Sequence, residues 1–115
     1  MIYFSPFSIV VHPLYLQQIG SPRWCILEME GTTLRILPKD APVAGTIPIP
    51  EQLYSPNRPA EMVAEFQIHN AQEYLREKLG WQFEEYHRCE PEIADNVILV
   101  PLEKAETIKL SEFPQ

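Results

Sequence analysis

The stretch YLREKLG at residues 74–80 decides the expected fold, because YLQQIG at residues 15–20 repeats its pattern. Each stretch places helix-forming residues before a glycine, a residue that commonly ends helices. Each also follows a segment with the composition of a strand, residues 7–11 in the first case and residues 62–69 in the second. The order strand, short helix, glycine is therefore predicted twice along the chain.

A hairpin is predicted after each of these helices. In the first half, residues 23–30 alternate as a strand, residues 30–32 supply a turn, and residues 33–37 return. In the second half, residues 81–89 alternate and residues 97–100 return after a longer turn region.

We therefore predict an α+β fold made of two tandem strand–helix–hairpin units. Unit one spans residues 4–38 and unit two spans residues 62–104. Together they would form a small mixed β barrel or sheet with two short helices. The whole chain, residues 1–115, is expected to be a single domain, because a unit of roughly 35 residues cannot bury its own apolar face.

The segment between the units is rich in proline. Half of the twelve prolines fall in residues 38–60, with Gly45 and Asn57 among them, so this segment is predicted to be an extended connector. Residues 46–49 within it are expected to form a short edge strand, since proline is tolerated at sheet edges.

The charge is acidic and unevenly distributed. The formal net charge is -7, with three basic and four acidic side chains in residues 1–57 and six and twelve in residues 58–115. Such a balance disfavours simple capture of a phosphate backbone and favours a basic protein partner. The longest apolar run is far shorter than the ~20 residues of a membrane span, so no membrane association and a cytoplasmic location are expected. Cys25 and Cys89 are expected to be free and buried.

The second half carries a family resemblance. The segments EFQI at residues 65–68, YLREKLGW at residues 74–81 and VILVP at residues 97–101 resemble the bacterial AbrB, MazE and SpoVT swapped-hairpin family. The resemblance implies a tandem fusion of two halves into a pseudo-dimer, and a role in transcription regulation or as an antitoxin.

The DNA-binding role that the resemblance implies lacks its expected side chains. Residues 8–13 and 65–70 contain no Arg or Lys, the donors that base and phosphate contacts need. Nucleic acid is therefore a disfavoured partner, although Arg23, Arg35 and Lys39 would restore that reading if they converged on one side of the first hairpin.

Candidate ligand-binding residues lie in the second unit. Strand alternation places Phe83, Glu85, His87 and Cys89 on one face, and the candidate site comprises His69, Trp81, Glu85, His87 and Cys89. His and Cys can bind zinc, but no C-x-x-C or H-x-x-x-H pattern accompanies them, so no metal is expected. No glycine-rich phosphate loop is present, and no cofactor is expected. No local sequence typical of a catalytic Cys surrounds either thiol, so no catalytic residue is assigned.

Two functions stay open on these patterns. The first is a non-catalytic regulatory or protein-interaction module that binds a protein partner or a second copy of itself. The alternative is a small-ligand-binding or enzymatic domain with its site between the two units. The acidic charge and the missing catalytic motifs favour the first.

Overall fold

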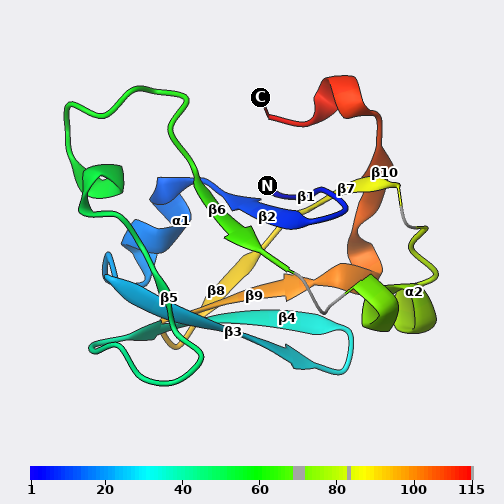
Figure 1. The fold of residues 1–115 in the computed structure, drawn as a ribbon, viewed down its shortest axis with the longest axis horizontal. Coiled ribbons are helices and arrows are strands. Elements are labelled where there is room, and N and C mark those ends of the chain that lie inside the picture. The colour runs from blue at the N-terminus through cyan, green and yellow to red at the C-terminus, as the bar shows by residue number, and fades with distance from the viewer. Residues whose placement is uncertain (69–71, 83, 115) are drawn as a thin grey trace.

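The computed structural model describes residues 1–68, 72–82 and 84–114. These residues form ten strands in two antiparallel five-stranded sheets, which face each other as the two layers of a sandwich (Figure 1). Sheet A has the order β10 (Glu106–Ile108), β7 (Tyr86–Cys89), β1 (Ile2–Phe4), β2 (Ser8–Val11) and β6 (Ala64–Gln67). Sheet B has the order β5 (Ile47–Pro48), β3 (Trp24–Glu30), β4 (Thr33–Lys39), β9 (Val97–Pro101) and β8 (Glu92–Ala94).

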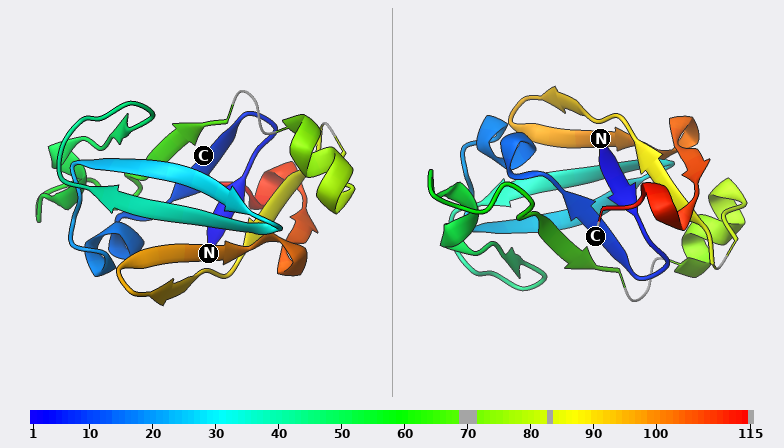
Figure 2. Two further views of the ribbon diagram at one scale, coloured as in Figure 1. Left: turned by 90° about the horizontal axis from the view of Figure 1, so that it is seen from below. Right: turned by 90° about the horizontal axis from the view of Figure 1, so that it is seen from above.

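Two short α-helices lie at opposite ends of the sandwich, α1 (Pro13–Gln18) and α2 (Gln72–Leu79) (Figure 2). The ring of His12 caps α1, since its Nδ1 accepts a hydrogen bond from the Leu14 backbone N–H at 3.1 Å, and Pro13 occupies the first turn. Both helices end at a glycine with a left-handed backbone, as predicted: Gly20 has φ +97° and Gly80 has φ +72°. Three single 3₁₀ turns complete the helical structure of the described residues, η1 (Glu51–Tyr54), η2 (Leu102–Lys104) and η3 (Leu110–Glu112).

The core lies between the two sheets. Its largest fully buried side chains come from both sheets, from α1 and from η2, and they are Ile2, Phe4, Val11, Pro13, Leu16, Cys25, Ile36, Cys89, Ile98, Val100 and Leu102. The chain therefore builds one core from residues near both of its ends. No helix in the described residues is long and apolar enough to cross a membrane.

The prediction of two tandem strand–helix–hairpin units in a mixed barrel or sheet is wrong. Residues 86–89 and 97–101 do not pair as a hairpin, because β7 lies in sheet A between β1 and β10, whereas β9 lies in sheet B between β4 and β8. The strand β1 was not predicted, and it takes the place beside β7 that the prediction gave to β9. The two halves of the chain therefore share both sheets, and all of their pairings are antiparallel.

Local hairpin predictions agree better with the structure. β3 and β4 pair from Trp24↔Lys39 to Glu30↔Thr33 around a two-residue turn in which Gly31 has φ +62°, which glycine adopts without strain. The longer turn region predicted before residue 97 contains the unpredicted strand β8, and its last two residues, Asp95 and Asn96, join β8 to β9 with positive φ. The predicted edge strand in the connector is β5, which pairs with β3 only.

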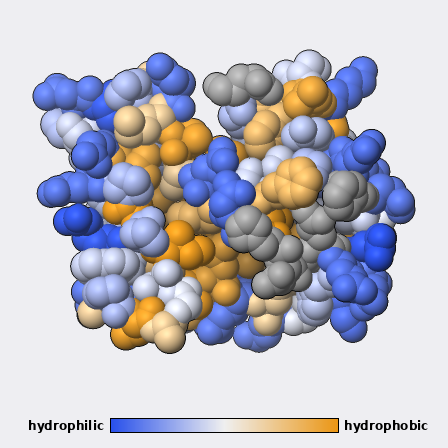
Figure 3. Space-filling view, viewed as in Figure 1, coloured by the Kyte–Doolittle hydropathy of each residue, from blue (hydrophilic) through white to orange (hydrophobic). Residues whose placement is uncertain are grey.

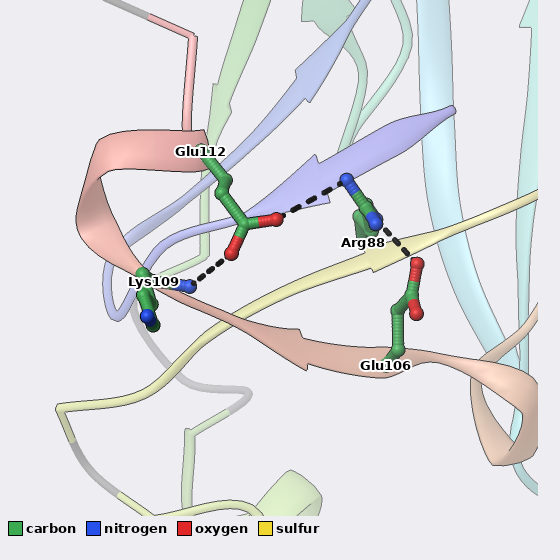
Figure 4. Close-up of polar contacts among 4 residues, drawn as sticks. All are labelled: Arg88, Glu106, Lys109 and Glu112. Atoms are coloured by element: carbon green, nitrogen blue, oxygen red, sulfur yellow. Dashed lines mark hydrogen bonds and ion pairs between the residues drawn. The ribbon is translucent and has the colours of Figure 1, made fainter.

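Arg88 holds the C-terminal segment against sheet A (Figure 4). Its Nε donates to the Glu106 carboxylate on β10, and its Nη1 lies 3.5 Å from Glu112 Oε2 on η3. Glu112 Oε1 in turn accepts the backbone N–H of Lys109 at 3.1 Å. The Phe113 ring packs edge-on against the Tyr86 ring, with ring centroids 5.1 Å apart. Both charged and aromatic contacts therefore fix this segment.

Two leucine substitutions in α1 test whether this helix packs against the core, and we predict that they have unequal effects on stability. Leu16 is fully buried and Leu14 is 55% exposed on the same helix. Leu16→Ala is expected to lower the free energy of unfolding by about 2–5 kcal/mol, because it leaves a cavity. Leu14→Ala, with the same change in helix propensity, is expected to change it by about 0.5 kcal/mol or less. Urea denaturation measures both, and equal effects would contradict the placement of α1.

Candidate functional site

The site is organised around Trp81, the residue that follows Gly80 at the end of α2. One face of its indole stacks on the His87 ring, with ring centroids 3.7 Å apart and planes 10° apart. Phe4 from β1 packs against the indole edge-on at 5.4 Å. Trp81 is thus fixed by two strands of sheet A and stays half-buried.

A pocket of about 310 Å³ opens beside Trp81, between the turn that follows β1, the helix α2, and Gln82 and Glu85. We call it the Trp81 pocket. Its floor is apolar and its rim carries polar and charged groups. The lining residues are Ser5, Pro6, Ile68, Glu73, Leu75, Arg76, Trp81, Gln82 and Glu85.

Hydrogen bonds and a buried side chain fix the positions of the charged groups that line the pocket. The Tyr74 hydroxyl donates to the Gly31 carbonyl at 2.6 Å, and Leu75 is buried, which orients α2 so that Glu73 and Arg76 reach the pocket. Gln82 N–H donates to Glu85 Oε1 at 2.7 Å, while Glu85 N–H donates to the Gln82 carbonyl at 3.2 Å. This reciprocal pair fixes the Glu85 carboxylate beside the indole.

His87 lies behind the indole and is 3% exposed. Its Nε2 is 3.7 Å from Glu85 Oε1, an ion-pair distance that is too long for a hydrogen bond, and its Nδ1 has no hydrogen-bond partner among the described residues. Burial lowers the pKa of His87 below its ordinary value, and the Glu85 carboxylate opposes that shift only in part. The imidazole is therefore neutral at pH 7 and packs as an aromatic ring.

Neither thiol is set up for nucleophilic chemistry. Burial raises the pKa of Cys25 to about 12, and burial together with the neighbouring Glu90 carboxylate raises the pKa of Cys89. The Cys89 Sγ–H also donates to the Pro101 carbonyl at 3.1 Å. Both cysteines are free and buried, as expected.

The Ser5 hydroxyl, which lines the pocket, forms its hydrogen bonds within its own turn. Ser5 Oγ lies 2.7 Å from Ser8 Oγ and accepts the Ser8 backbone N–H at 3.0 Å. These bonds are local and shape the chain between β1 and β2. Ser5 therefore contributes to the form of the pocket rather than supplying an activated nucleophile.

The structure brings together three of the five predicted site residues, Trp81, Glu85 and His87. Cys89 lies two residues beyond His87 on the buried face of β7, as the alternation predicted, but its thiol bonds to the backbone of sheet B. His69, like Phe83 and the predicted cap Asn70, lies outside the described residues. Within the described part of the chain, no group of three or more His, Cys, Asp or Glu is placed to hold a metal ion.

Sequence reasoning missed the other side of the pocket. Glu73 and Arg76 are three residues apart on a helix, and this spacing signals a shared face, but charged residues at this spacing are equally typical of a solvated helix surface. Ser5 and Pro6 gave no signal, because they reach the pocket only through the pairing of β1 with β7.

Two of the three basic residues of the first hairpin, Arg23 and Arg35, are paired with carboxylates. Arg35 Nη1 bonds to Glu28 Oε1 at 2.7 Å, across the hairpin, and lies 3.7 Å from Glu30 Oε2. Arg23 Nη1 lies 3.8 Å from Glu51 Oε2. Lys39 lies across from Trp24, at the far end of the hairpin from Arg35. The arrangement that would restore nucleic-acid binding is therefore weakened by neighbouring negative charge.

Comparison with known proteins leaves the family open. The chain matches no protein-family model, and neither curated proteins nor solved structures give a match. The resemblance to the swapped-hairpin family therefore stays a prediction, and the site has to be interpreted from its own geometry.

We predict that acid destabilises the protein through His87. The unfolded imidazole has a pKa near 6.5 and the folded one a lower pKa, so the unfolded chain binds more protons as the pH falls. The contribution of His87 to stability is complete above pH 6.5 and is lost as the pH falls towards the folded pKa, by at most about 1.4 kcal/mol per pH unit. Urea midpoints at about pH 7.5 and 5.5 measure the loss.

His87→Asn is expected to reduce this loss between the two pH values, even though the variant is less stable at both. His12 is the other described histidine whose pKa is lowered, by burial and by Arg58, so the double variant His12→Asn/His87→Asn is expected to reduce the loss further than His87→Asn alone. If His87→Asn and the unaltered chain lose the same stability on acidification, the assignment to His87 is wrong.

Proposed function

We propose that the protein is a non-catalytic binding module whose Trp81 pocket holds a cationic group on an apolar stem, such as a Lys or Arg side chain of a protein partner. The observation that carries the proposal is the position of two carboxylates, Glu73 and Glu85, on the rim of a pocket lined by an indole. Carboxylates and aromatic rings are the two groups that attract an ammonium or guanidinium ion most directly.

The charge around the pocket supports a cationic ligand. Residues 58–115 contain twelve acidic and six basic side chains, and the pocket lies mainly in this half of the chain. Long-range attraction therefore steers cations towards it. Arg76 is exposed on the same rim and pairs with no carboxylate in the described residues, so it is available to donate to a carbonyl or carboxylate group of the ligand.

The size and lining of the pocket support a single side chain or a small molecule. A volume of about 310 Å³ lies at the lower end of the range of small-molecule sites. Pro6, Ile68 and Leu75 supply apolar surface for the aliphatic stem of a Lys or Arg, which gains stability when it packs on such surface.

The absence of catalysis is part of the proposal, and it is supported by the state of the reactive groups. The two thiols have raised pKa values, the Ser5 hydroxyl is bonded within its turn, and His87 forms no hydrogen bond with a hydroxyl or thiol in the described region. A nucleophile and a base within hydrogen-bond reach would be needed for covalent catalysis. Binding is the function that this geometry serves without further rearrangement.

We predict that a lysine-containing peptide binds at Trp81. In a Trp24→Phe background Trp81 is the remaining tryptophan, so its fluorescence reports on the pocket. Acetylated and amidated Ala-Lys-Ala is expected to change that fluorescence saturably, whereas the Ala-Glu-Ala counterpart is not. Glu73→Gln and Glu85→Gln are each expected to weaken binding several-fold, and added salt is expected to weaken it further because it screens the carboxylates.

Glu77→Gln is the matched control, because Glu77 lies on the same helix with an exposed side chain that does not line the pocket. n-Butylamine separates the two sources of the cation: tighter binding of the peptide than of the amine supports a protein partner, and equal binding supports a small amine ligand. Failure of both probes to bind, or an equal effect of Glu77→Gln, would contradict the proposal.

A further inference from the structure

The strand β6 forms one edge of sheet A. It pairs with β2 on one side, from Ser8↔Gln67 to Val11↔Ala64, and no other strand of the described residues pairs with it. Both views in Figure 2 place β6 at the outer margin of the molecule. An edge strand of this kind presents backbone donors and acceptors that a further strand can use.

The register identifies the outward-facing backbone groups. Ile68 N–H donates to the Phe7 carbonyl at 2.9 Å, and hydrogen-bonded pairs recur at every second residue of an antiparallel ladder. The backbone groups of Ala64, Phe66 and Ile68 therefore face β2. Those of Glu65 and Gln67 face outward, and the side chains of these two residues are exposed on the outer face of the sheet.

An apolar groove of about 440 Å³ runs beside this edge. Pro48, Pro50 and Leu53, from β5 and η1, form one wall, and residues 62–66 form the other. Figure 3 shows apolar surface gathered on the face where β5 and β6 lie. The open edge and the exposed apolar surface therefore adjoin each other, a combination that marks interaction sites.

We propose that β6 is the contact between two copies of this chain, which pair β6 with β6 in antiparallel fashion about a two-fold axis at Phe66. Outward-facing residues must oppose outward-facing residues, so Glu65 pairs with Gln67 of the second copy and Gln67 with its Glu65. This arrangement extends sheet A across the two copies and turns their apolar grooves towards each other, as an isologous contact requires.

The side chains favour this register over the one with its axis at Glu65. With the axis at Phe66, each carboxylate meets an amide, and within one chain Gln67 Nε2 already donates to Glu65 Oε1 at 3.2 Å. With the axis at Glu65, two carboxylates would lie directly opposite each other, which is destabilising. The neutral pair also limits charge repulsion at a contact between two chains that each carry a net charge of -7.

A second copy accounts for the surface without any further partner. The apolar groove needs an apolar surface to cover it, and the groove of the second copy supplies one in the same register. Because both chains are acidic, added salt is expected to strengthen this contact, whereas it weakens cation binding at Trp81. The inference therefore does not rest on the proposed function, and Trp81→Ala is expected to leave it unchanged.

Sedimentation equilibrium over a range of protein concentrations tests the contact. The chain is expected to associate reversibly to a dimer, more tightly at high salt. Gln67→Lys is expected to tighten the dimer several-fold, since it creates two opposite-charge pairs with Glu65, and Gln67→Glu is expected to weaken it by placing like charges opposite each other. Gln18→Lys, an exposed change of the same charge on α1, controls for the altered net charge.

Amide hydrogen exchange gives a second measurement that does not depend on any variant. The N–H groups of Glu65 and Gln67 are expected to gain protection as the protein concentration rises, while those of exposed residues elsewhere do not. A monomer at every concentration, equal effects of Gln67→Lys and Gln18→Lys, or unchanged exchange at Glu65 and Gln67 would each overturn the proposal.

Discussion

The pairing of β1 with β7 is the contact on which the rest of the structure depends. It joins Ile2↔Cys89 and Phe4↔His87, and so it links the first residues of the chain to a strand that begins more than 80 positions later. Ile2 and Phe4 are buried in the core, and Phe4 also packs against Trp81. The core and the candidate site therefore share one ladder, and a change that loosened it would affect both.

The sequence predicted local structure better than it predicted pairing. The strand before α1, both helix ends at glycine, the β3–β4 hairpin and the edge strand in the connector follow from residue type and periodicity over a few neighbours. The partner of each later strand does not, because β7 and β9 both alternate buried with half-buried residues, and nothing in their own residues states which sheet each joins. Three short strands, β1, β8 and β10, have three residues each, too few for a periodic pattern to stand out.

The candidate site was likewise predictable where it depends on local sequence and not where it depends on contacts between distant segments. Alternation along β7 correctly placed His87 and Cys89 on the buried face, and Trp81, which was grouped with them as a candidate, stacks on His87. Two of the three charged groups of the pocket, Glu73 and Arg76, come from α2, and the turn with Ser5 and Pro6 comes from the other end of the chain. Only the tertiary fold brings these three segments together.

The charged Trp81 pocket and the apolar groove beside β6 are lined by different parts of the chain. The Trp81 pocket draws its charged groups from α2 and the loop after it, whereas the groove beside β6 is bordered by prolines and aliphatic side chains from the connector. The two proposals assign them opposite responses to ionic strength, because one involves attraction of unlike charge and the other the approach of like charges.

The order of strands in sheet A has a consequence for the synthesis of the protein. β1 and β2 leave the ribosome early, yet β7 and β10, which complete their sheet, are translated last. The buried side chains of β1 must therefore stay exposed until most of the chain has emerged, and a nascent chain in this state is prone to association. The β3–β4 hairpin, whose strands are joined by two residues, is free to form long before. The β3–β4 hairpin is thus the part of sheet B that can form before the earliest residues meet their partners.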